Sequence, residues 1–178
     1  MSVLSYNELV ELVESGVIDA KPEHINAASI DITLGSELLV ETVPSDAHKL
    51  QVDLASKQTL HMALKDHTLL FPNQFVLGHS QETFNLPNNI AAEYKLKSSL
   101  ARSGLEHLNA GWCDPGWSGQ LTLELKNVCE WHTLHLTPGM KVGQMIFYKV
   151  SAVPEHASYK TKGQYNDQRG VQQSKGVK

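Results

Sequence analysis

Hydrophobic and polar residues alternate along much of the chain, and a period of two is typical of strands with one buried face. The segment 28–41, ASIDITLGSELLVE, alternates through Ile30, Ile32 and Leu34 and turns at Gly35. Pro, Asn and Gly separate further short runs of this kind, at 67–71, 74–80, 89–97, 119–127, 132–136 and 141–150. Many short strands at close intervals predict a mainly β protein, either an antiparallel barrel or a double sheet.

The N-terminal segment SYNELVELVESG has a helical period instead. Ser5 and Glu8 have the spacing of a capping box, an apolar stripe through Leu9 and Leu12 follows, and Gly16 supplies the stop. We expect a short amphipathic helix that packs on the sheet.

The segment KSSLARSGL predicts a helical turn near 98–104, capped by Ser98 or Ser99. Backbone N–H groups at a helix start, two hydroxyls, Lys97 and Arg102 together have the chemistry of an anion site. An ordinary capped turn with solvated cations explains the same residues, so this stretch leaves both interpretations open.

The strand-like segment GQLTLELKN places Leu121, Leu123 and Leu125 on one face, so Glu124 points the other way. An isolated Glu on an alternating strand is usually a solvated charge. The other reading is a carboxylate that lies in a pocket and moves protons.

The composition changes after Val153. We expect one domain over 1–153 and a tail over 154–178, which has almost no residues suited to a core. A tail of this kind is either disordered or a lid that orders over a ligand. The side chains suited to a lid are aromatic or polar: Tyr159, Gln164, Tyr165, Gln168 and Arg169.

Composition narrows the class of protein. A chain of 178 residues with 41% hydrophobic residues is long enough for one core. A formal charge of −4 argues against a nucleic-acid partner. The sequence has two cysteines, no signal-peptide pattern and no long apolar run, which favours a cytoplasmic protein without a membrane partner.

The usual motifs of several enzyme classes are missing from the sequence. The H-x-E and P-C-x-x-C pattern of zinc deaminases does not occur, nor does a serine-hydrolase elbow, a Walker loop or a dinucleotide fingerprint. Nine histidines are scattered without metal-ligand spacing, so we predict no metal ligands and assign most of these histidines to the surface or to strands.

Five stretches, in order over residues 28–171, resemble the successive motifs of dCTP deaminases in the dUTPase-like superfamily: SIDITLG, KSSLARSGL, NAGWCDPGWSGQLTLELKN, TPGMKVGQMIF and YKTKGQYNDQRG. The resemblance implies a distorted antiparallel β-barrel and a homotrimer with active sites between subunits. It also implies deamination without zinc, with Mg²⁺ bound through the phosphates of the nucleotide.

The resemblance also implies catalytic roles. Glu124 matches the glutamate that relays protons during attack of water on C4 of cytosine. Ser98 and the carbonyl of Ala110 match the groups that hold this water, and Arg102 matches the arginine that braces the site. Asp114 matches an aspartate near the deoxyribose, and in dUTPases an aspartate in the equivalent turn orients the water that attacks phosphorus.

Substrate contacts follow from the same motifs. Trp117 matches the floor of the sugar pocket, although core packing alone explains a tryptophan there. The remaining matches are phosphate contacts by Lys97, Ser99 and Gln144 and closure over the triphosphate by Tyr159, Tyr165 and Gln168.

Two positions depart from the family pattern. Many relatives have Arg in place of Lys97, and G-K-Y where this chain has Gln164 in GQY, which removes a cation unless Lys160 or Lys162 replaces it. The preferred number of phosphates, and a substituent at position 5 of the cytosine, therefore stay open.

The expected activity is hydrolysis of dCTP to dUTP and ammonia, in the synthesis of dTTP precursors. The first alternative is a bifunctional enzyme that yields dUMP and pyrophosphate, and the second is a deaminase of dCMP or of a 5-modified cytosine nucleotide. The tail lacks the Gly-rich, Ser-containing motif of trimeric dUTPases, which disfavours a pure dUTPase. A non-catalytic nucleotide-binding regulator is disfavoured because Ser98, Arg102 and Glu124 are all present.

Overall fold

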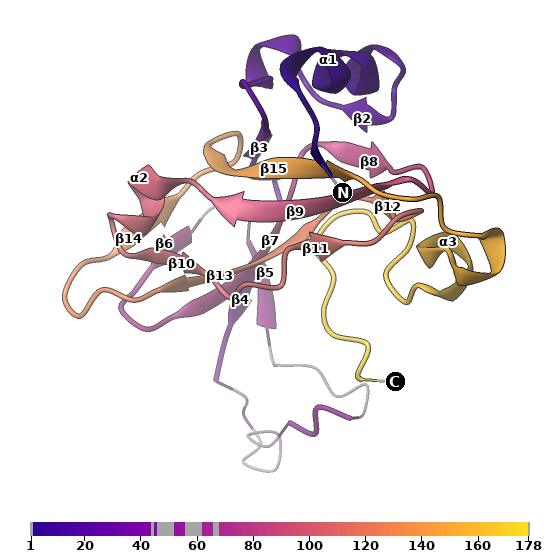
Figure 1. Ribbon diagram of the computed structural model, residues 1–178. Coiled ribbons are helices and arrows are strands. Elements are labelled where there is room, and N and C mark those ends of the chain that lie inside the picture. The colour runs from indigo at the N-terminus through magenta and orange to yellow at the C-terminus, as the bar shows by residue number, and fades with distance from the viewer. Residues whose placement is uncertain (1, 44, 46–51, 56–61, 66–67, 178) are drawn as a thin grey trace.

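The fold consists mainly of short antiparallel strands (Figure 1). A computed structural model describes residues 2–43, 45, 52–55, 62–65 and 68–177. Within this part, the first sheet contains β1 (Ser2–Val3), β3 (Ile30–Thr33), β9 (Ile90–Leu96), β11 (Trp112–Cys113) and β15 (Lys141–Lys149), in the order β1-β15-β9-β11 with β3 also paired to β15. The second sheet contains β4 (Leu38–Glu41), β5 (Met62–Lys65), β7 (Phe75–His79), β10 (Leu105–His107) and β13 (Thr122–Asn127), in the order β10-β13-β7-β4-β5.

Two smaller sheets and short helical segments complete the described chain. One small sheet has the order β12-β8-β2 and contains β2 (Ile18–Asp19), β8 (Thr83–Asn85) and β12 (Ser118–Gly119), and the other pairs β6 (Thr68–Leu70) with β14 (Leu134–Leu136). The helices are α1 (Tyr6–Glu14), α2 (Ser98–Ala101) and α3 (Tyr159–Lys162), with 3-10 turns η1 (Pro22–His24) and η3 (Glu155–Ala157). The predicted mainly β class is confirmed, and the antiparallel sheets are compatible with a distorted barrel.

Alternation along the longer strands builds the core between the sheets. Leu123 and Leu125 of β13 are fully buried, as are Met145 and Phe147 of β15. Phe147 packs on Phe84 of β8 with ring centroids 6.4 Å apart. Each such apolar side chain contributes about 1.5–3 kcal/mol when buried, so these strands hold the sheets together.

Helix α1 begins as the sequence predicts. The Glu8 carboxylate accepts a hydrogen bond from the Ser5 N–H at 2.8 Å, and this contact lowers the pKa of Glu8. Leu9 is fully buried and Leu12 packs on the core, while Gly16 follows the helix with a φ of 73°. In Figure 1 the helix lies with β2 at one end of the molecule.

Helix α2 differs from the prediction at its cap. Lys97 occupies the N-cap position, and no side-chain hydrogen bond caps the helix. The prediction of a cap by Ser98 or Ser99 is therefore wrong, because both serines lie inside the helical turn.

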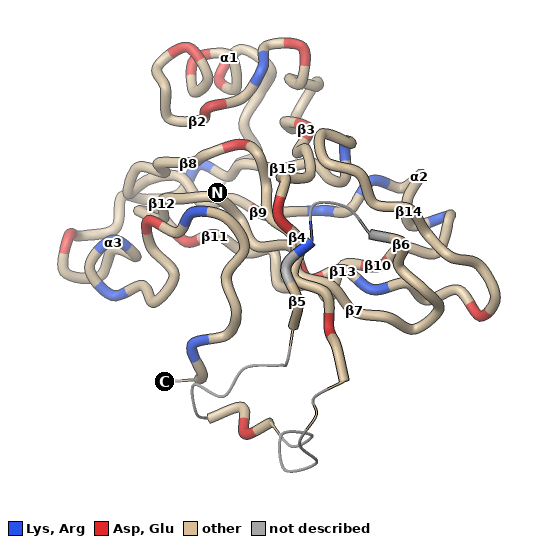
Figure 2. The backbone as a smooth tube through the Cα atoms, turned by 180° about the vertical axis from the view of Figure 1, so that it is seen from behind, with Lys and Arg blue, Asp and Glu red and all other residues tan. Residues whose placement is uncertain are grey.

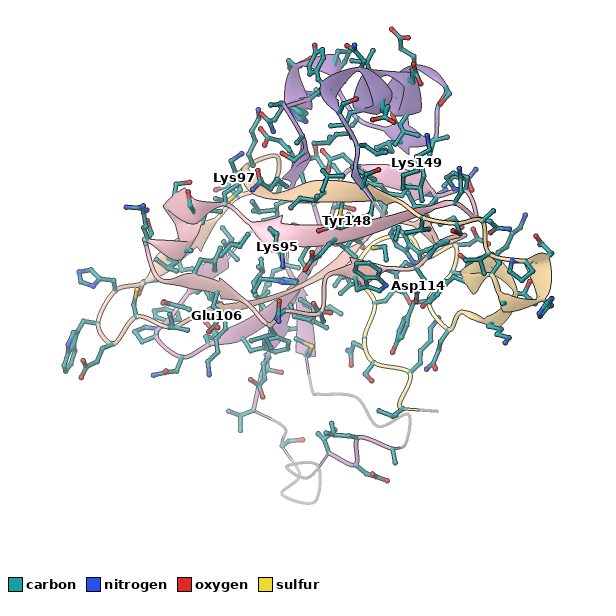
Figure 3. The ribbon with its side chains drawn as sticks, in the orientation of Figure 1. Lys95, Lys97, Glu106, Asp114, Tyr148 and Lys149 are labelled. Atoms are coloured by element: carbon teal, nitrogen blue, oxygen red, sulfur yellow. The ribbon has the colours of Figure 1, made fainter. Side chains whose placement is uncertain are left out.

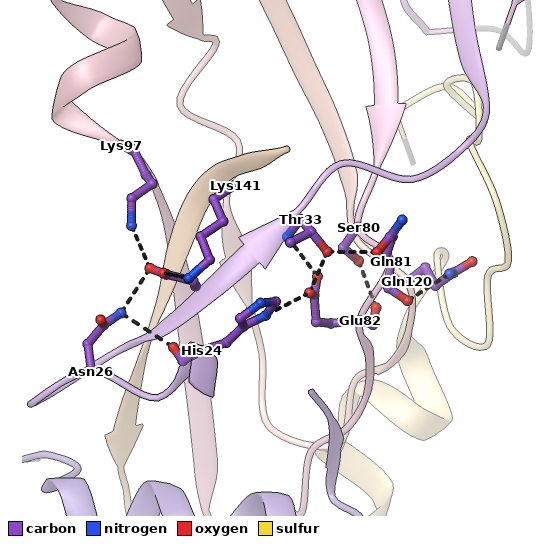
Figure 4. Close-up of polar contacts among 10 residues, drawn as sticks. His24, Asn26, Thr33, Ser80, Gln81, Glu82, Lys97, Gln120 and Lys141 are labelled. Carbon is purple, nitrogen blue, oxygen red and sulfur yellow. Dashed lines mark hydrogen bonds and ion pairs between the residues drawn. The ribbon is translucent and has the colours of Figure 1, made fainter. Parts of the chain in front are cut away.

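A buried polar network attaches η1 to the sheets. The Glu82 carboxylate accepts hydrogen bonds from the Thr33 N–H at 3.0 Å and from the Thr33 hydroxyl at 2.7 Å. His24 Nδ1 lies 3.7 Å from the same carboxylate (Figure 4). The network joins the N-terminal turn to β3 and to the start of β8, which are far apart in the sequence.

The C-terminal segment lies against the barrel in spite of its polar composition. Gly119 forms a parallel β-bridge with Gln168, and the Gln120 N–H donates to the Gln168 carbonyl at 3.0 Å. Gly119 has a φ of 126°, and a Cβ there would lie 2.8 Å from Gln168 backbone atoms. Glycine is therefore required both by the backbone and by the close approach of the tail. The domain boundary at 153/154 and the lid role stay predictions.

Candidate functional site

A cavity of about 500 Å³ lies between β13, the loop around Asp114 and the C-terminal segment. Its walls include apolar side chains such as Leu77 and Leu121. The cavity brings together seven of the residues predicted from the sequence: Ala110, Asp114, Trp117, Glu124, Tyr159, Tyr165 and Gln168.

Glu124 faces this cavity from β13. Its neighbours Leu123 and Leu125 are fully buried on the other face, as the alternation predicts. The Glu124 side chain is 27% exposed, and its Oε2 atom is buried without a hydrogen-bond partner among the described residues. The carboxylate therefore lies in a pocket rather than on an open solvated face, an environment in which a carboxylate can exchange protons with a bound molecule.

His107 lies beside Glu124 and was missed by the sequence reasoning. Its Nε2 atom is 3.3 Å from Glu124 Oε2, without hydrogen-bond alignment, and its side chain is 5% exposed. The His107 ring packs on Tyr94 with centroids 4.6 Å apart. Burial, followed by the charge of Glu124, raises the pKa of the Tyr94 hydroxyl. The only sequence signal was a histidine in a three-residue strand, and that signal is too short to give a period.

Three polar atoms in this cluster are buried and lack hydrogen-bond partners among the described residues: Tyr94 OH, His107 Nε2 and Glu124 Oε2. Such atoms are rare in folded proteins, because an unpaired buried polar group costs about 1–3 kcal/mol. A water or a ligand group bound in the cavity would satisfy the Glu124 oxygen, whereas Tyr94 and His107 do not line the cavity.

Ala110 reaches the cavity through a left-handed turn. Asn109 has a φ of 61°, a conformation that Asn adopts more readily than most residues. The preceding Leu108 N–H donates to the Glu124 carbonyl at 3.0 Å, which attaches this loop to β13. The turn therefore holds Ala110 on the same cavity wall as Glu124.

Asp114 and Trp117 flank a tight turn at the cavity mouth. Asp114 Oδ1 accepts a hydrogen bond from Trp112 Nε1 at 2.9 Å, and the Trp117 N–H donates to the Asp114 carbonyl at 3.1 Å. Trp117 is 4% exposed and packs on Phe84 with ring centroids 5.7 Å apart. Trp117 is therefore a core residue that also lines the cavity.

The tail contributes the outer wall. Trp117 Nε1 donates to the Tyr165 carbonyl at 3.0 Å, and the Tyr165 N–H donates to the Tyr159 hydroxyl at 3.3 Å. Gln168 is 8% exposed and its Nε2 donates to the Gln120 carbonyl at 2.5 Å, while its Oε1 has no partner among the described residues. The tail thus contributes aromatic rings to the lining, together with two amides, Gln168 and Gln173, whose oxygens have no partner among the described residues.

The other five predicted residues do not line this cavity: Lys97, Ser98, Ser99, Arg102 and Gln144. Four of them lie in or next to α2, at the end of β9 away from Asp114 (Figure 3). Gln144 lies on β15 opposite Lys95 of β9, and its Oε1 accepts a hydrogen bond from Ser29 at 3.3 Å. A single chain therefore carries the predicted site in two separate halves.

Lys97 is held by a buried carboxylate. Lys97 Nζ lies 2.5 Å from Asp31 Oδ1, and Lys141 Nζ lies 2.9 Å from Asp31 Oδ2 (Figure 4). Burial alone would raise the pKa of Asp31, but hydrogen bonds from Lys97, Lys141 and Asn26 lower it to about 2. Two lysines around one carboxylate leave a net positive charge next to α2.

The described residues contain no group of three or more His, Cys, Asp or Glu side chains that could hold a metal ion. Cys113 is buried and Cys129 is partly exposed, and both are free thiols. Across the described part of the chain, no helix has the length and apolar character needed to cross a membrane.

Known proteins resemble the chain over most of its length. It is 35% identical over 179 residues to a protein of Dictyoglomus thermophilum named "dCTP deaminase, dUMP-forming", an alignment that covers 94% of this chain and 91% of that protein. A protein of the same name from Nocardioides sp. is 48% identical over 105 residues, which are 57% of this chain and 54% of that protein. The solved 2'-deoxycytidine 5'-triphosphate deaminase of Agrobacterium tumefaciens shares the fold with a TM-score of 0.63 at 18% identity, over 82% of this chain and 47% of that chain.

These names correct one expectation. The curated relatives are named for dUMP as product, which contradicts the prediction that the reaction stops at dUTP. Residues 3–150 also match the family described as dCTP deaminase-like. The chain therefore belongs to the dCTP deaminase family.

Proposed function

We propose that this protein converts dCTP and two water molecules into dUMP, ammonia and pyrophosphate. The observation that carries the proposal is the Glu124 carboxylate in a mostly apolar cavity, with the Asp114 carboxylate on the same lining. One carboxylate suits proton transfer at the base and the other suits water activation at the α-phosphorus. The product agrees with the names of the curated relatives.

In the deamination step, Glu124 takes a proton from water as the oxygen attacks C4 of cytosine. Glu124 delivers this proton to N3. It then takes the second proton from the hydroxyl now on C4 and passes it to the amine, so that C4=O forms as the C4–N bond breaks and ammonia leaves. The carbonyl of Ala110 accepts a hydrogen bond from the attacking water. Water exclusion by the apolar walls strengthens these interactions.

In the second step, Asp114 orients the water that attacks the α-phosphorus, and pyrophosphate leaves. Asp114 Oδ1 accepts from Trp112 at 2.9 Å, while Oδ2 has no hydrogen bond among the described residues. The indole therefore fixes the carboxylate and leaves one oxygen for water.

The active enzyme is a homotrimer in which each site joins two subunits. This proposal is supported by the cavity within one chain, which Glu124 lines and Ser98 and Arg102 do not. In the trimer, Ser98 of a neighbouring subunit holds the attacking water and Arg102 stabilises developing charge. Lys97, Ser99 and Gln144 bind phosphates from the same side.

Mg²⁺ accompanies the substrate, bound through the phosphates. The described residues fit this arrangement, because the cavity offers two carboxylates and Mg²⁺ bound to a nucleotide takes one or two carboxylates at most. When bound, the ion neutralises charge on the phosphates. Deamination itself uses no zinc, and the protein works in the cytoplasm.

Product analysis tests the proposal. Purified protein with dCTP and Mg²⁺ should release ammonia and pyrophosphate in equal amounts and accumulate dUMP. Accumulation of dUTP as the end product would refute the second step. A deaminase of dCMP or of a 5-modified cytosine nucleotide would prefer those substrates over dCTP in the same assay.

A variant tests the role of Glu124. Glu124→Gln should lower kcat for ammonia release by about 10²–10⁴-fold, the usual contribution of a general base. Glu106→Gln is the matched control, because Glu106 is an exposed carboxylate on β10 that does not line the cavity. Near-normal turnover by Glu124→Gln would contradict the mechanism.

A further inference from the structure

The cavity has a charge balance that does not suit its proposed substrate. Its described lining contains two carboxylates, Asp114 and Glu124, and no Lys or Arg. A nucleoside triphosphate is strongly anionic, and two carboxylates nearby oppose its binding. The phosphates therefore need positive charge that this lining lacks, from the accompanying Mg²⁺, from the rim or from another subunit.

Lys175 lies at this rim. Its neighbour Ser174 lines the cavity, and the Lys175 N–H donates to the Tyr165 hydroxyl at 2.9 Å. Lys175 Nζ donates to the Gln164 carbonyl at 2.9 Å and lies 5.1 Å from the centre of the Tyr165 ring. Because Tyr165 lines the cavity, the ammonium group lies next to a residue of the cavity wall.

Contacts along the last residues hold Lys175 in place. Gln164 Nε2 donates to the Gly176 carbonyl at 3.0 Å, and the Val177 N–H donates to the Leu54 carbonyl at 3.1 Å. Both contacts follow Lys175 in the chain, and the Lys175 N–H itself donates to the Tyr165 hydroxyl, so ordering the lysine on binding costs little further entropy. Figure 2 shows Lys and Arg positions on α3 and near the C-terminus, on the side of the molecule away from α2.

The charge of Lys175 is available to a ligand. Among the described residues Lys175 forms no ion pair with a carboxylate, whereas Lys97 and Lys141 both bind Asp31. An ammonium group has three donors, and the Gln164 carbonyl uses one of them. Lys162, in contrast, lines a second cavity of about 440 Å³, and Asp114, Tyr159 and Tyr165 line both cavities.

We propose that Lys175 is a specificity-determining residue that binds the β- and γ-phosphates of the nucleotide and so replaces the cation that Gln164 lacks. This inference rests on the proposed function for the identity of the nucleotide. The Gln164 carbonyl holds the ammonium group beside the ring of Tyr165, a residue of the cavity wall.

Kinetics of Lys175→Gln test the proposal. A charge-assisted hydrogen bond corresponds to about a 10-fold change in affinity, so KM for dCTP should rise about 10-fold while kcat stays within about 2-fold. Lys175→Arg should keep KM within about 3-fold, because the charge remains. Lys149→Gln is the matched control, since Lys149 is an exposed lysine near Glu8 on the β1–β15 edge. An unchanged KM in Lys175→Gln would overturn the inference.

Equilibrium binding separates this inference from the proposed function. In a Glu124→Gln background, tryptophan fluorescence gives Kd without turnover, and adding Lys175→Gln should weaken dCTP about 10-fold and dCMP less than about 2-fold. Equal weakening of dCTP and dCMP would overturn the phosphate role. If the unmodified protein forms no dUMP yet dCTP binding still depends on Lys175, the proposed function fails and this inference stands.

Discussion

The contact between His107 and Glu124 predicts a loss of kcat when the histidine is replaced. His107→Phe keeps an aromatic ring against Tyr94, whose centroid lies 4.6 Å away, but removes the Nε2 atom 3.3 Å from Glu124. The buried Oε2 atom of Glu124 then loses this polar contact. We expect kcat for dUMP formation to fall because the carboxylate is no longer held in one orientation.

The magnitude follows from the burial of the pair. The two atoms lie 3.3 Å apart without hydrogen-bond alignment, so the expected effect on kcat comes from a hydrogen bond that aligns when substrate binds. A hydrogen bond to a charged group contributes about 1.5–3 kcal/mol, and the 27% exposure of Glu124 favours the lower end. About 1.4 kcal/mol corresponds to a 10-fold loss of kcat. KM should stay within about 2-fold, since His107 does not line the cavity.

Steady-state release of ammonia and dUMP measures this effect, together with the melting temperature of each variant. His135→Phe is the matched control, because His135 is exposed on β14. A wild-type kcat in His107→Phe would refute the positioning role. A loss of activity that parallels a loss of folded protein would also refute it.

Three further predictions concern the fold and the tail. Asp31 has a folded-state pKa of about 2, below its ordinary 3.8, so its charged form stabilises the folded protein by about 2 kcal/mol. This contribution is complete above about pH 4 and is lost as the pH falls toward 2. In Asp31→Asn, the free energy of unfolding should no longer fall over this pH range. Gly119→Ala, at a φ of 126° and against the Gln168 backbone, should displace the tail and lower kcat/KM at least about 10-fold, with faster proteolysis beyond residue 154 as the readout. Nucleotide binding should slow amide exchange in 159–170, and unchanged exchange would remove the tail from the site.

Periodicity predicts the long strands because they have one fully buried face. Strands β3, β9, β13 and β15 all fall inside segments with visible alternation. The two-residue strands β1, β2, β11 and β12 are too short to show any period, and only their partners in space define them. Local pattern therefore recovers the framework of the sheets and misses the short strands that complete it.

Individual site residues were predictable where a motif was long. The DPGWSGQLTLELKN stretch places Asp114, Trp117 and Glu124 on one cavity, and all three line it. The pairing of Lys97 with Asp31 was not predictable, because 66 residues separate them and only the alignment of β3, β15 and β9 brings them together. His107 was missed for a related reason, since its role depends on a neighbouring strand rather than on its own segment.

The Asp31 contact also bears on how the two halves of the site work together. Lys97 can bind a phosphate only by sharing or leaving Asp31, which is 4% exposed and would be costly to leave charged without a partner. Lys141, 2.9 Å from the other oxygen of Asp31, stays in place and keeps that carboxylate paired. The proposed phosphate contact of Lys97 therefore does not leave an unpaired buried charge, because Lys141 stays beside Asp31. We accordingly expect Lys141→Met to weaken dCTP binding through Lys97, although Lys141 need not touch the substrate. The change in binding free energy of the double variant should then differ from the sum of the changes in Lys97→Met and Lys141→Met. Additive effects would mean that the two lysines act independently.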